Sequence, residues 1–378
     1  MEDNLLSIQV VNIGDGACTV LRTFRETMLI DCGAHDDKTG TRSADRLASV
    51  LGSAPQGLNA IVVSHFDADH WRGLAELPQR IAPVGPIRLI YPRLPDSARP
   101  VAPMIAALLS VMDGAAPHVN ALKLRDEWKR VASQVRSYAY RRGNRFHAVG
   151  KTWTVHWPPT EVSGTWSTLF ERVRREVAEA AEKWPDLRRA LRDAFAAVEE
   201  TPLEVDDDFD DFEGRLTDIP EEADGESDAW AGSRVTKDTI PEANEAEPTF
   251  SAAPDELRDK MPGLYRDLQR LNNSLSLVIS DDEHELLAMG DVEGWGLRRL
   301  LLTNDFSNRG FHTILAPHHG TVAPKPAEAP LFPFSGTTVA QTGAEREKGR
   351  EAWLHRATFR VHSTYLDGDY VTHPRFST

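Results

Sequence analysis

The sequence predicts an α/β protein whose reactive side chains follow the ends of buried strands. Apolar runs of strand length alternate with amphipathic helical segments along the chain. Polar clusters come directly after three of those runs, and α/β proteins place their working residues at such positions. The 378 residues are 40% hydrophobic, enough to bury a core. No run reaches the roughly 18 apolar residues of a bilayer helix.

The N-terminal segment predicts a meander of strands followed by a strand, helix, strand unit. The apolar runs LLSIQVVNI, ACTVLRT and ETMLIDCG are separated by GDG and short polar turns. The buried run 60–63 ends in a polar cluster, ADHWRGLAELPQRI has helical spacing, and PIRLIYPRL predicts the next strand. Residues 103–145 are expected to be mainly helical, before TWTVHWPP returns to strand.

The centre of the chain predicts an insertion between two halves of one domain. WSTLFERVRREVAEAAEKW and PDLRRALRDAFAAVEE predict two amphipathic helices broken at Pro185. Residues 201–253 are poor in aliphatics and rich in acid, Pro, Gly and Ser, which predicts an exposed, partly disordered segment. We therefore expect two halves of one domain at 1–160 and 261–378, with a helical and acidic insertion at 161–260.

The C-terminal half repeats the alternation of strands and helices. ELRDKMPGLYRDLQRL predicts a helix, and SLSLVIS with HELLAMGD predicts a hairpin. A helix over 295–302, the strands FHTILAP, TTVAQT and FRVHSTY, and a helix over 344–357 complete the prediction.

Charge and cysteine content limit the partners and the compartment. The net charge is −15, but residues 199–256 hold 21 acids and three bases, while the other 320 residues carry 40 bases and 37 acids. A nearly neutral body can still bind nucleic acid where its bases cluster, and the acidic insertion is a candidate site for a protein partner. The two cysteines cannot form a disulfide framework, and the N-terminus lacks the pattern of a secretory signal. We expect a cytoplasmic protein.

Four metal-ligand side chains within six residues directly follow a buried strand. They are His65, Asp67, Asp69 and His70. Imidazole and carboxylate groups bind divalent metals, and a loop at a strand end can turn all four inward. Asp291 in AMGDVEGW and the pair His318 and His319 in ILAPHHGT follow other apolar runs. The alternatives are a solvated acidic loop, a turn aspartate and surface histidines.

These motifs resemble the metallo-β-lactamase fold superfamily. Its HxHxDH loop is matched by SHFDADH, with Asp67 where most members have His. VNIGDGACTVL, MLIDCG, NNSLSLVIS, MGD and PHHG are similar to the soluble hydrolase domain of ComEC-type DNA-uptake competence proteins. The resemblance covers roughly residues 6–92 and 270–322, with His373-Pro374 near the end, and excludes the helical and acidic middle.

The resemblance implies a four-layer αββα sandwich of two mixed sheets flanked by helices, with two divalent metal ions. By this mapping His65 and Asp67 hold one metal, and Asp291 bridges the two metals. The other metal takes Asp69, His70 and one His of the 318/319 pair, with His319 preferred because it precedes the glycine. Asp31 and Asn273 support the site. Because this donor set is rich in oxygen, Mn²⁺ competes with Zn²⁺.

Two adjacent metals can generate a hydroxide and stabilise a phosphoryl group, so we expect a phosphodiesterase, foremost a nuclease acting on DNA. Asp69, His318 and His373 are the candidate catalytic residues, and either histidine can protonate the leaving group. One alternative is hydrolysis of a small ester, lactone or phosphodiester. Another is a partner-binding subunit of a defence or toxin-like complex.

A basic stretch at residues 123–145 is a candidate nucleic-acid groove. It holds eight bases against two acids, interleaved with aromatic residues that can stack on bases. The candidate contacts are Lys129, Arg130, Arg136, Arg141 and Arg142. The alternative is a solvated helix face with its aromatic side chains in the core.

Overall fold

The structure, a computed structural model, describes residues 6–52, 55, 57–95, 101–112, 121–161, 165–200, 261–303, 306, 309–322, 329–343, 353 and 360–372. Three sequence predictions lie outside these residues: the acidic segment 201–253, His373, and the helix over 344–357 apart from Trp353.

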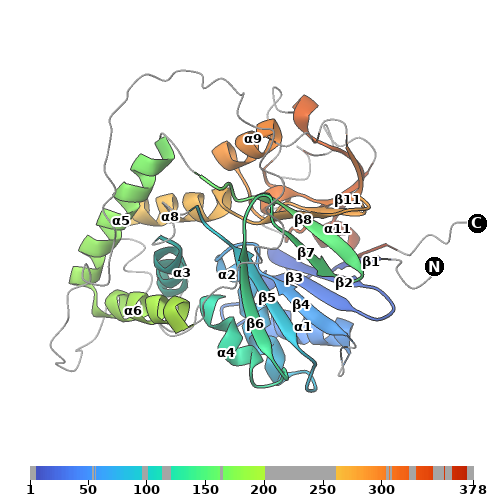
Figure 1. The fold of residues 1–378 in the computed structure, drawn as a ribbon, viewed down its shortest axis with the longest axis horizontal. Helices are drawn as coiled ribbons and strands as arrows, with labels where there is room; N and C mark the ends of the chain where they lie inside the picture. The colour runs from blue at the N-terminus through green and yellow to red at the C-terminus, as the bar shows by residue number, and fades with distance from the viewer. Residues whose placement is uncertain are drawn as a thin grey trace, which may run out of the picture.

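Within the described residues, fourteen strands form two seven-stranded sheets that face each other (Figure 1). The first sheet contains Ser7–Val10 (β1), Gly16–Arg22 (β2), Thr27–Ala34 (β3), Leu58–Val62 (β4), Ile87–Pro92 (β5), Val135–Tyr140 (β6) and Tyr370–Val371 (β14), in the order β14-β1-β2-β3-β4-β5-β6. The second contains Arg145–Ala148 (β7), Lys151–Trp157 (β8), Val278–Asp281 (β9), Leu286–Ala288 (β10), Gly310–Leu315 (β11), Phe334–Ala340 (β12) and Val361–Ser363 (β13), in the order β13-β12-β11-β10-β9-β8-β7.

Both sheets are mixed, and the parallel part of each directs its strand ends to one edge. β3 to β6 are parallel neighbours, whereas β1 pairs antiparallel with β2 and β2 antiparallel with β3. β10 to β13 are parallel in the second sheet. Segments that follow β4, β10 and β11 therefore start from the carboxyl ends of strands, where loops of α/β proteins carry functional side chains.

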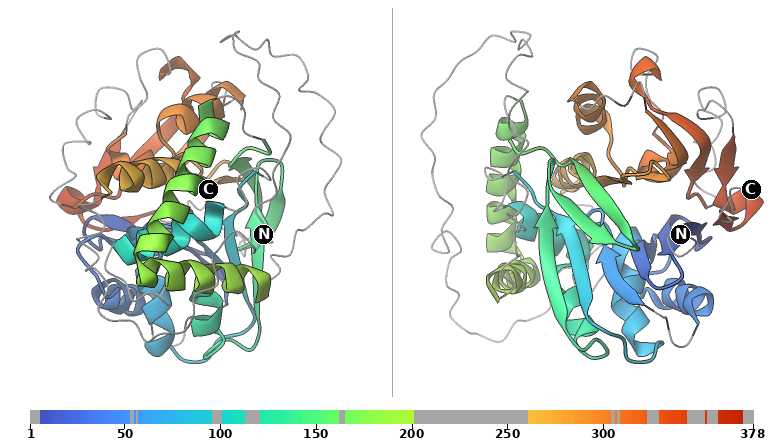
Figure 2. Two further views of the ribbon diagram at one scale, coloured as in Figure 1. Left: turned by 90° about the vertical axis from the view of Figure 1, so that its left-hand side faces the viewer. Right: turned by 45° about the vertical axis from the view of Figure 1, so that its right-hand side comes forward.

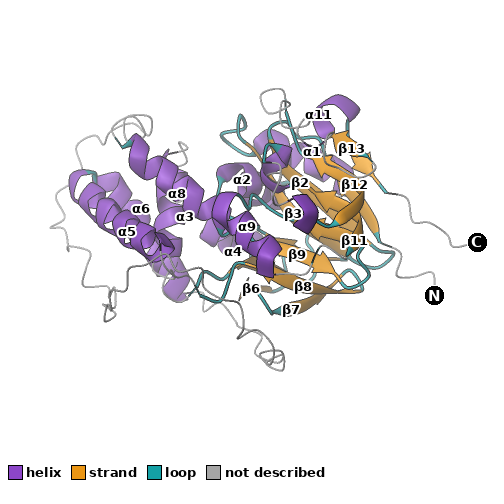
Figure 3. Cartoon of the chain, turned by 90° about the horizontal axis from the view of Figure 1, so that it is seen from above, coloured by secondary structure: helices purple, strands orange, loops and turns teal. Residues whose placement is uncertain are grey.

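Helices cover the outer faces of both sheets. They are Thr41–Leu51 (α1), Ala68–Glu76 (α2), Val101–Met112 (α3), Leu124–Trp128 (α4), Thr165–Lys183 (α5), Pro185–Glu200 (α6), Pro262–Ser274 (α8), Gly294–Thr303 (α9) and Thr364–Asp367 (α11), with 3₁₀ turns at Leu77–Gln79, Ala121–Lys123, Pro317–Gly320 and Ala329–Leu331. The helices α3, α5, α6 and α8 gather at one side of the sandwich (Figures 2 and 3). No described helix is both long enough and apolar enough to cross a membrane.

Three buried apolar clusters correspond to the interfaces between four layers. The cluster between the sheets joins residues such as Ile30 and Val62 of the first sheet to Ile279 and Leu315 of the second. A second cluster joins the outer face of the first sheet to α2, α3, α5, α6 and α8. A third packs α9 against the second sheet. The predicted αββα sandwich of two mixed sheets is thus confirmed.

The mainly helical expectation for residues 103–145 is wrong in its second half. The structure places β6 at Val135–Tyr140 and begins β7 at Arg145. β6 pairs in parallel with β5 over its whole length, so its conformation depends on a distant partner strand. The predicted hairpin is confirmed, because β9 and β10 pair antiparallel.

Candidate metal centre

The segment after β4 carries four candidate ligands, but only His65 and Asp67 lie in the predicted loop, because α2 already begins at Ala68. Contacts to two helices hold this segment. Phe66 N–H donates to Asn272 Oδ1 of α8 (3.0 Å), and Trp71 Nε1–H of α2 donates to the Phe66 carbonyl oxygen (3.0 Å). Gly33 of β3 lets the first turn of α2 approach, because a Cβ there would lie 2.5 Å from the Ala68 carbonyl oxygen. Asp69 and His70 lie in this turn.

The second sheet supplies the opposite side of the centre. Asp291 follows β10, and its backbone N–H donates to Ser276 Oγ (3.2 Å). His318 and His319 follow β11 with left-handed backbones, φ 50° and 56°. Such φ values are uncommon outside glycine and gather where a fold holds functional residues under strain. His319 is buried, whereas His318 is half-buried.

The first ligand group surrounds Nε2 of His65. This atom lies 3.4 Å from Asp67 Oδ2 and 3.6 Å from Asp291 Oδ2. Neither His65 Nε2 nor Asp67 Oδ1 has a hydrogen-bond partner, although both are buried. Because buried polar atoms are normally paired, these two atoms fit a bound cation.

The second ligand group brings His70 and His319 together with Asp69. The two Nε2 atoms lie 3.2 Å apart, and His319 Nε2 lies 3.3 Å from Asp69 Oδ2. Asp291 contacts this group too, at 3.3 Å from His70 Nε2 and 3.4 Å from His319 Nε2. It therefore touches ligands of both groups, as a bridging carboxylate would.

His70 belongs spatially to both possible triads, His65–His70–Asp291 and Asp69–His70–His319. Its Nδ1 contacts Asp31 Oδ2 at 2.9 Å, so we assign the Nδ1 proton to this hydrogen bond and leave Nε2 as the single ligand atom. Since Nε2 is nearest to His319, the second group is its better assignment.

Burial and mutual charge shift the titration of the centre. Burial and the neighbouring His70 lower the pKa of His65 to about 3, so this imidazole is neutral and its lone pair is free for a metal. Burial and the carboxylates Asp69 and Asp291 raise the pKa of Asp67 to about 7. Although burial opposes it, His319 and His70 hold the pKa of Asp291 well below its usual range. Carboxylates crowded in this way favour a cation.

Asp31 and Asn273 contact the ligands from behind. Asp31 Oδ1 accepts from the Ser64 N–H at 2.7 Å, while Oδ2 holds His70. In one amide orientation Asn273 donates to Glu293 Oε1 at 3.3 Å, and in the flipped orientation to Asp67 Oδ2 at 3.1 Å. The flipped orientation thus supports the candidate ligand Asp67, and the other supports Glu293, which lines the adjacent cavity.

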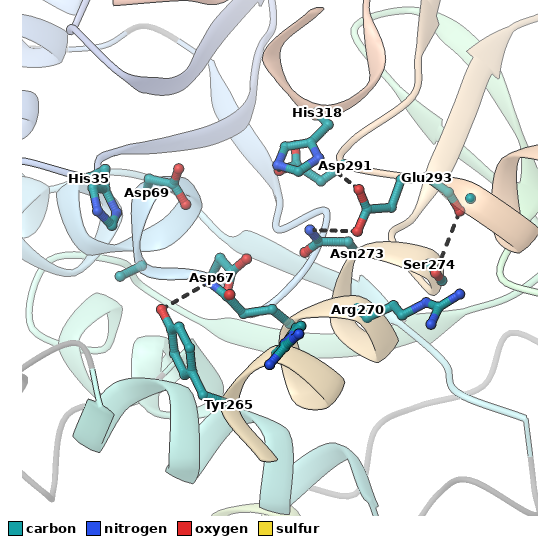
Figure 4. A pocket seen from close by; sticks show the side chains of 14 residues that line it. His35, Asp67, Asp69, Tyr265, Arg270, Asn273, Ser274, Asp291, Glu293 and His318 are labelled. Atoms are coloured by element: carbon teal, nitrogen blue, oxygen red, sulfur yellow. Dashed lines mark hydrogen bonds and ion pairs between the residues drawn. The ribbon is translucent and has the colours of Figure 1, made fainter. Parts of the chain in front are cut away.

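A cavity of about 390 Å³ lies against the centre. Asp67, Asp69 and Asp291 line it together with His318 (Figure 4). His318 Nδ1 lies 3.0 Å from Glu293 Oε2, and its Nε2 lies 3.9 Å from Asp291 Oδ2. The Glu293 carboxylate accepts Nδ1–H, which turns Nε2 toward the centre. This pair can bind a substrate group and exchange a proton with it.

Other residues of this cavity were missed in the sequence. They are His35, Tyr265, Arg266, Gln269, Arg270, Ser274 and Glu293. Glu293 stands two residues after Asp291, and the arginines are four residues apart just before Asn272. These two spacings are the sequence signals that could have identified Glu293 and the two arginines.

The basic stretch 123–145 does not line this cavity. Lys129 pairs with Asp126 at 2.9 Å, Arg130 pairs with Glu127 at 2.6 Å, and Arg142 donates to the Thr303 carbonyl oxygen. The interleaved aromatic residues Trp128, Tyr138, Tyr140 and Phe146 are buried, so stacking of these rings on bases is the wrong interpretation. Nucleic-acid binding by the five basic residues stays a prediction.

Residues 11–171 match the family model of the metallo-β-lactamase superfamily. No curated protein sequence matches the chain. Similar solved structures include the metallo-β-lactamase fold protein YhfI from Bacillus subtilis, at 7% identity and a TM-score of 0.41, over 97% of this chain and 99% of that one. The subclass B3 metallo-β-lactamase BJP-1 of Bradyrhizobium japonicum is 18% identical, with a TM-score of 0.25 over 42% and 50%. A Cronobacter sakazakii metallo-β-lactamase with a HARLDQ motif is 17% identical, with a TM-score of 0.25 over 51% and 90%.

Residues 11–171 are thus similar to the metallo-β-lactamase superfamily, and two groups of His and Asp side chains in the described part of the chain could each hold a metal ion. The match assigns residues 11–171 to that superfamily, so the predicted resemblance is confirmed at this level. The narrower likeness to ComEC-type domains is not shown by these comparisons.

Proposed function

We propose that the protein is a phosphodiesterase, foremost a nuclease acting on DNA, that works with two divalent metal ions. The observation that carries this proposal is the position of Asp291. It contacts His65 of one ligand group and His70 and His319 of the other, beside an open polar cavity. When bound, two such ions supply Lewis acidity that activates water and offsets the charge of a phosphoryl group.

The ligand set limits which ions fit. Three imidazoles and three carboxylates converge, from His65, His70, His319, Asp67, Asp69 and Asp291. Zn²⁺ accepts both donor types, while the carboxylate share also suits Mn²⁺. Asp31 orients His70 by accepting its Nδ1–H, which would leave Nε2 as the atom that holds an ion.

His318 is the proposed acid for the leaving group. Glu293 accepts Nδ1–H of His318 and stabilises the imidazolium, while Nε2 faces the centre. The protonated imidazole gives its Nε2 proton to the leaving alkoxide oxygen as the P–O bond breaks. His318 is then neutral and regains a proton from solvent, which reaches it because the side chain is half-buried.

The test combines metal content with hydrolysis. The full chain is loaded in turn with Zn²⁺, Mn²⁺ and Mg²⁺ and assayed on bis(p-nitrophenyl) phosphate and on single- and double-stranded DNA. We expect the double variant Asp69→Ala, His70→Ala to lose one metal equivalent and activity, and Asp291→Ala to lose both equivalents. Undiminished hydrolysis by the double variant would place the chemistry elsewhere.

A small ester, lactone or phosphodiester is the second candidate substrate. The cavity volume of about 390 Å³ favours it, because small-molecule sites have roughly 300–1,000 Å³. Turnover of a p-nitrophenyl ester or a lactone, with no cleavage of DNA under any metal, would select this candidate.

A further inference from the structure

Two arginines on α8 line the metal cavity without a counter-ion in the part of the chain that the structure describes. Arg266 and Arg270 are exposed, and neither forms a hydrogen bond or ion pair with a described residue. The acid between them in sequence, Asp267, pairs instead with Arg172 of α5. Figure 4 shows Arg270 reaching from α8 on the side of the cavity away from His318.

This arrangement has a structural cost. Residues four apart are neighbours on a helix surface, and like charges there destabilise the helix. Among the described residues no acid forms an ion pair with either arginine, so no direct contact compensates this repulsion within α8. A cavity that holds two unpaired guanidinium groups beside a metal centre is suited to an anion.

The charges of the loaded centre lead to the same ligand class, and this step rests on the proposed function. With the Glu293 carboxylate paired to the His318 imidazolium, two divalent ions would exceed the charge of Asp67, Asp69 and Asp291 by one. The two arginines add two further positive charges to the cavity. A phosphodiester at the ions carries a single negative charge, so a second anionic group is needed to use both arginines.

We infer that Arg266 and Arg270 bind phosphates adjacent to the one being cleaved, and thereby select an oligonucleotide strand over a diester with a single phosphate. Four residues of α-helix rise about 6 Å, so the two side chains can contact different phosphates of one strand. Each planar guanidinium presents paired N–H donors to phosphate oxygens. These are specificity residues, because no described contact joins them to the metal ligands.

The kinetic test compares two substrates that differ in phosphate number. The variants are Arg266→Gln/Arg270→Gln and a matched control, Arg309→Gln, which removes an exposed arginine at the start of β11, the end away from His318. For hexathymidylate we expect kcat/KM of the double variant to fall at least tenfold, chiefly through KM. For bis(p-nitrophenyl) phosphate the double variant should match the wild type within about twofold, and the control should match it on both substrates. An equal loss on both substrates, or no loss on either, would overturn the inference.

A binding measurement separates this inference from the proposed function. Fluorescence anisotropy follows a fluorescein-labelled phosphorothioate hexathymidylate bound to the metal-loaded protein at several salt concentrations. Removal of both guanidinium groups from the phosphates should reduce the slope of log K against log salt by about 1.4 for a single strand. An unchanged slope refutes the arginine contacts even if the enzyme is active. A reduced slope with no hydrolysis of any diester supports the contacts and refutes the proposed reaction.

Discussion

Replacing Asp31 by Asn should disable the second ligand group while leaving the fold intact. The two carboxylate oxygens of Asp31 have separate tasks, because Oδ1 accepts from the Ser64 N–H at 2.7 Å and Oδ2 holds Nδ1 of His70 at 2.9 Å. An amide offers a single acceptor. If the amide oxygen keeps the hydrogen bond from the Ser64 N–H, the amide NH₂ group faces Nδ1 of His70. It then donates to Nδ1 and favours the His70 tautomer that is protonated at Nε2. That atom is the one that faces His319.

The expected loss of metal affinity follows from the hydrogen bond between Asp31 and His70, which the amide cannot replace. A buried hydrogen bond to a charged group contributes about 1.5–3 kcal/mol, and removing the partner of a metal-bound histidine weakens metal binding about 10–100-fold. We expect one metal equivalent of Asp31→Asn to bind about 10–100-fold more weakly, which is roughly 1.4–2.8 kcal/mol. The other equivalent, held by His65 and Asp67, should change little.

A matched control is available in Asp37, which is also buried and accepts from both the N–H (2.8 Å) and the hydroxyl (2.9 Å) of Ser43. Competition with a zinc-responsive chelating dye measures each metal equivalent, and urea unfolding of the metal-free protein measures stability. Asp37→Asn should lose stability with unaltered metal affinity. Wild-type affinity in Asp31→Asn, or an equal loss of affinity in both variants, would refute the role assigned to Asp31.

Two further outcomes are expected. His318→Gly should be more stable to urea than His318→Ala by about 1 kcal/mol, because φ is 50° there. At His312 in β11 the glycine variant should instead be the less stable of the two. A glycine variant that is also the more stable one at His312 would argue against backbone strain at His318. The affinity for the metal at His65 should fall about tenfold per pH unit below about pH 7, because the raised pKa of Asp67 makes the metal displace a proton there. The low pKa of His65 keeps that ligand neutral across this range. If the metal affinity of Asp67→Asn falls as steeply with decreasing pH as that of the wild type, the displaced proton does not come from Asp67.

The convergence of the candidate ligands was predictable because each of them follows an apolar run, and the ends of parallel strands lie at one edge of a sheet. The distinction between His318 and His319 depends on Glu293, whose contact with Nδ1 only the folded chain creates. β6 escaped prediction for a similar reason, since its pairing partner β5 lies more than 40 residues earlier. The arginines of α8 line the cavity because that helix packs beside the loop after β4, and the Phe66–Asn272 contact joins residues 206 apart in sequence.

The division of the centre between the two sheets has a consequence for synthesis. His65 to His70 leave the ribosome more than 200 residues before Asp291 and His319. At about 5–20 residues per second, the first ligands wait about 10 to 50 s for Asp291 and His319 to appear. During that interval a nascent chain can offer a metal only four of the six candidate ligands. The complete centre can therefore form only after the chain has been synthesised as far as His319 and the two sheets have packed together.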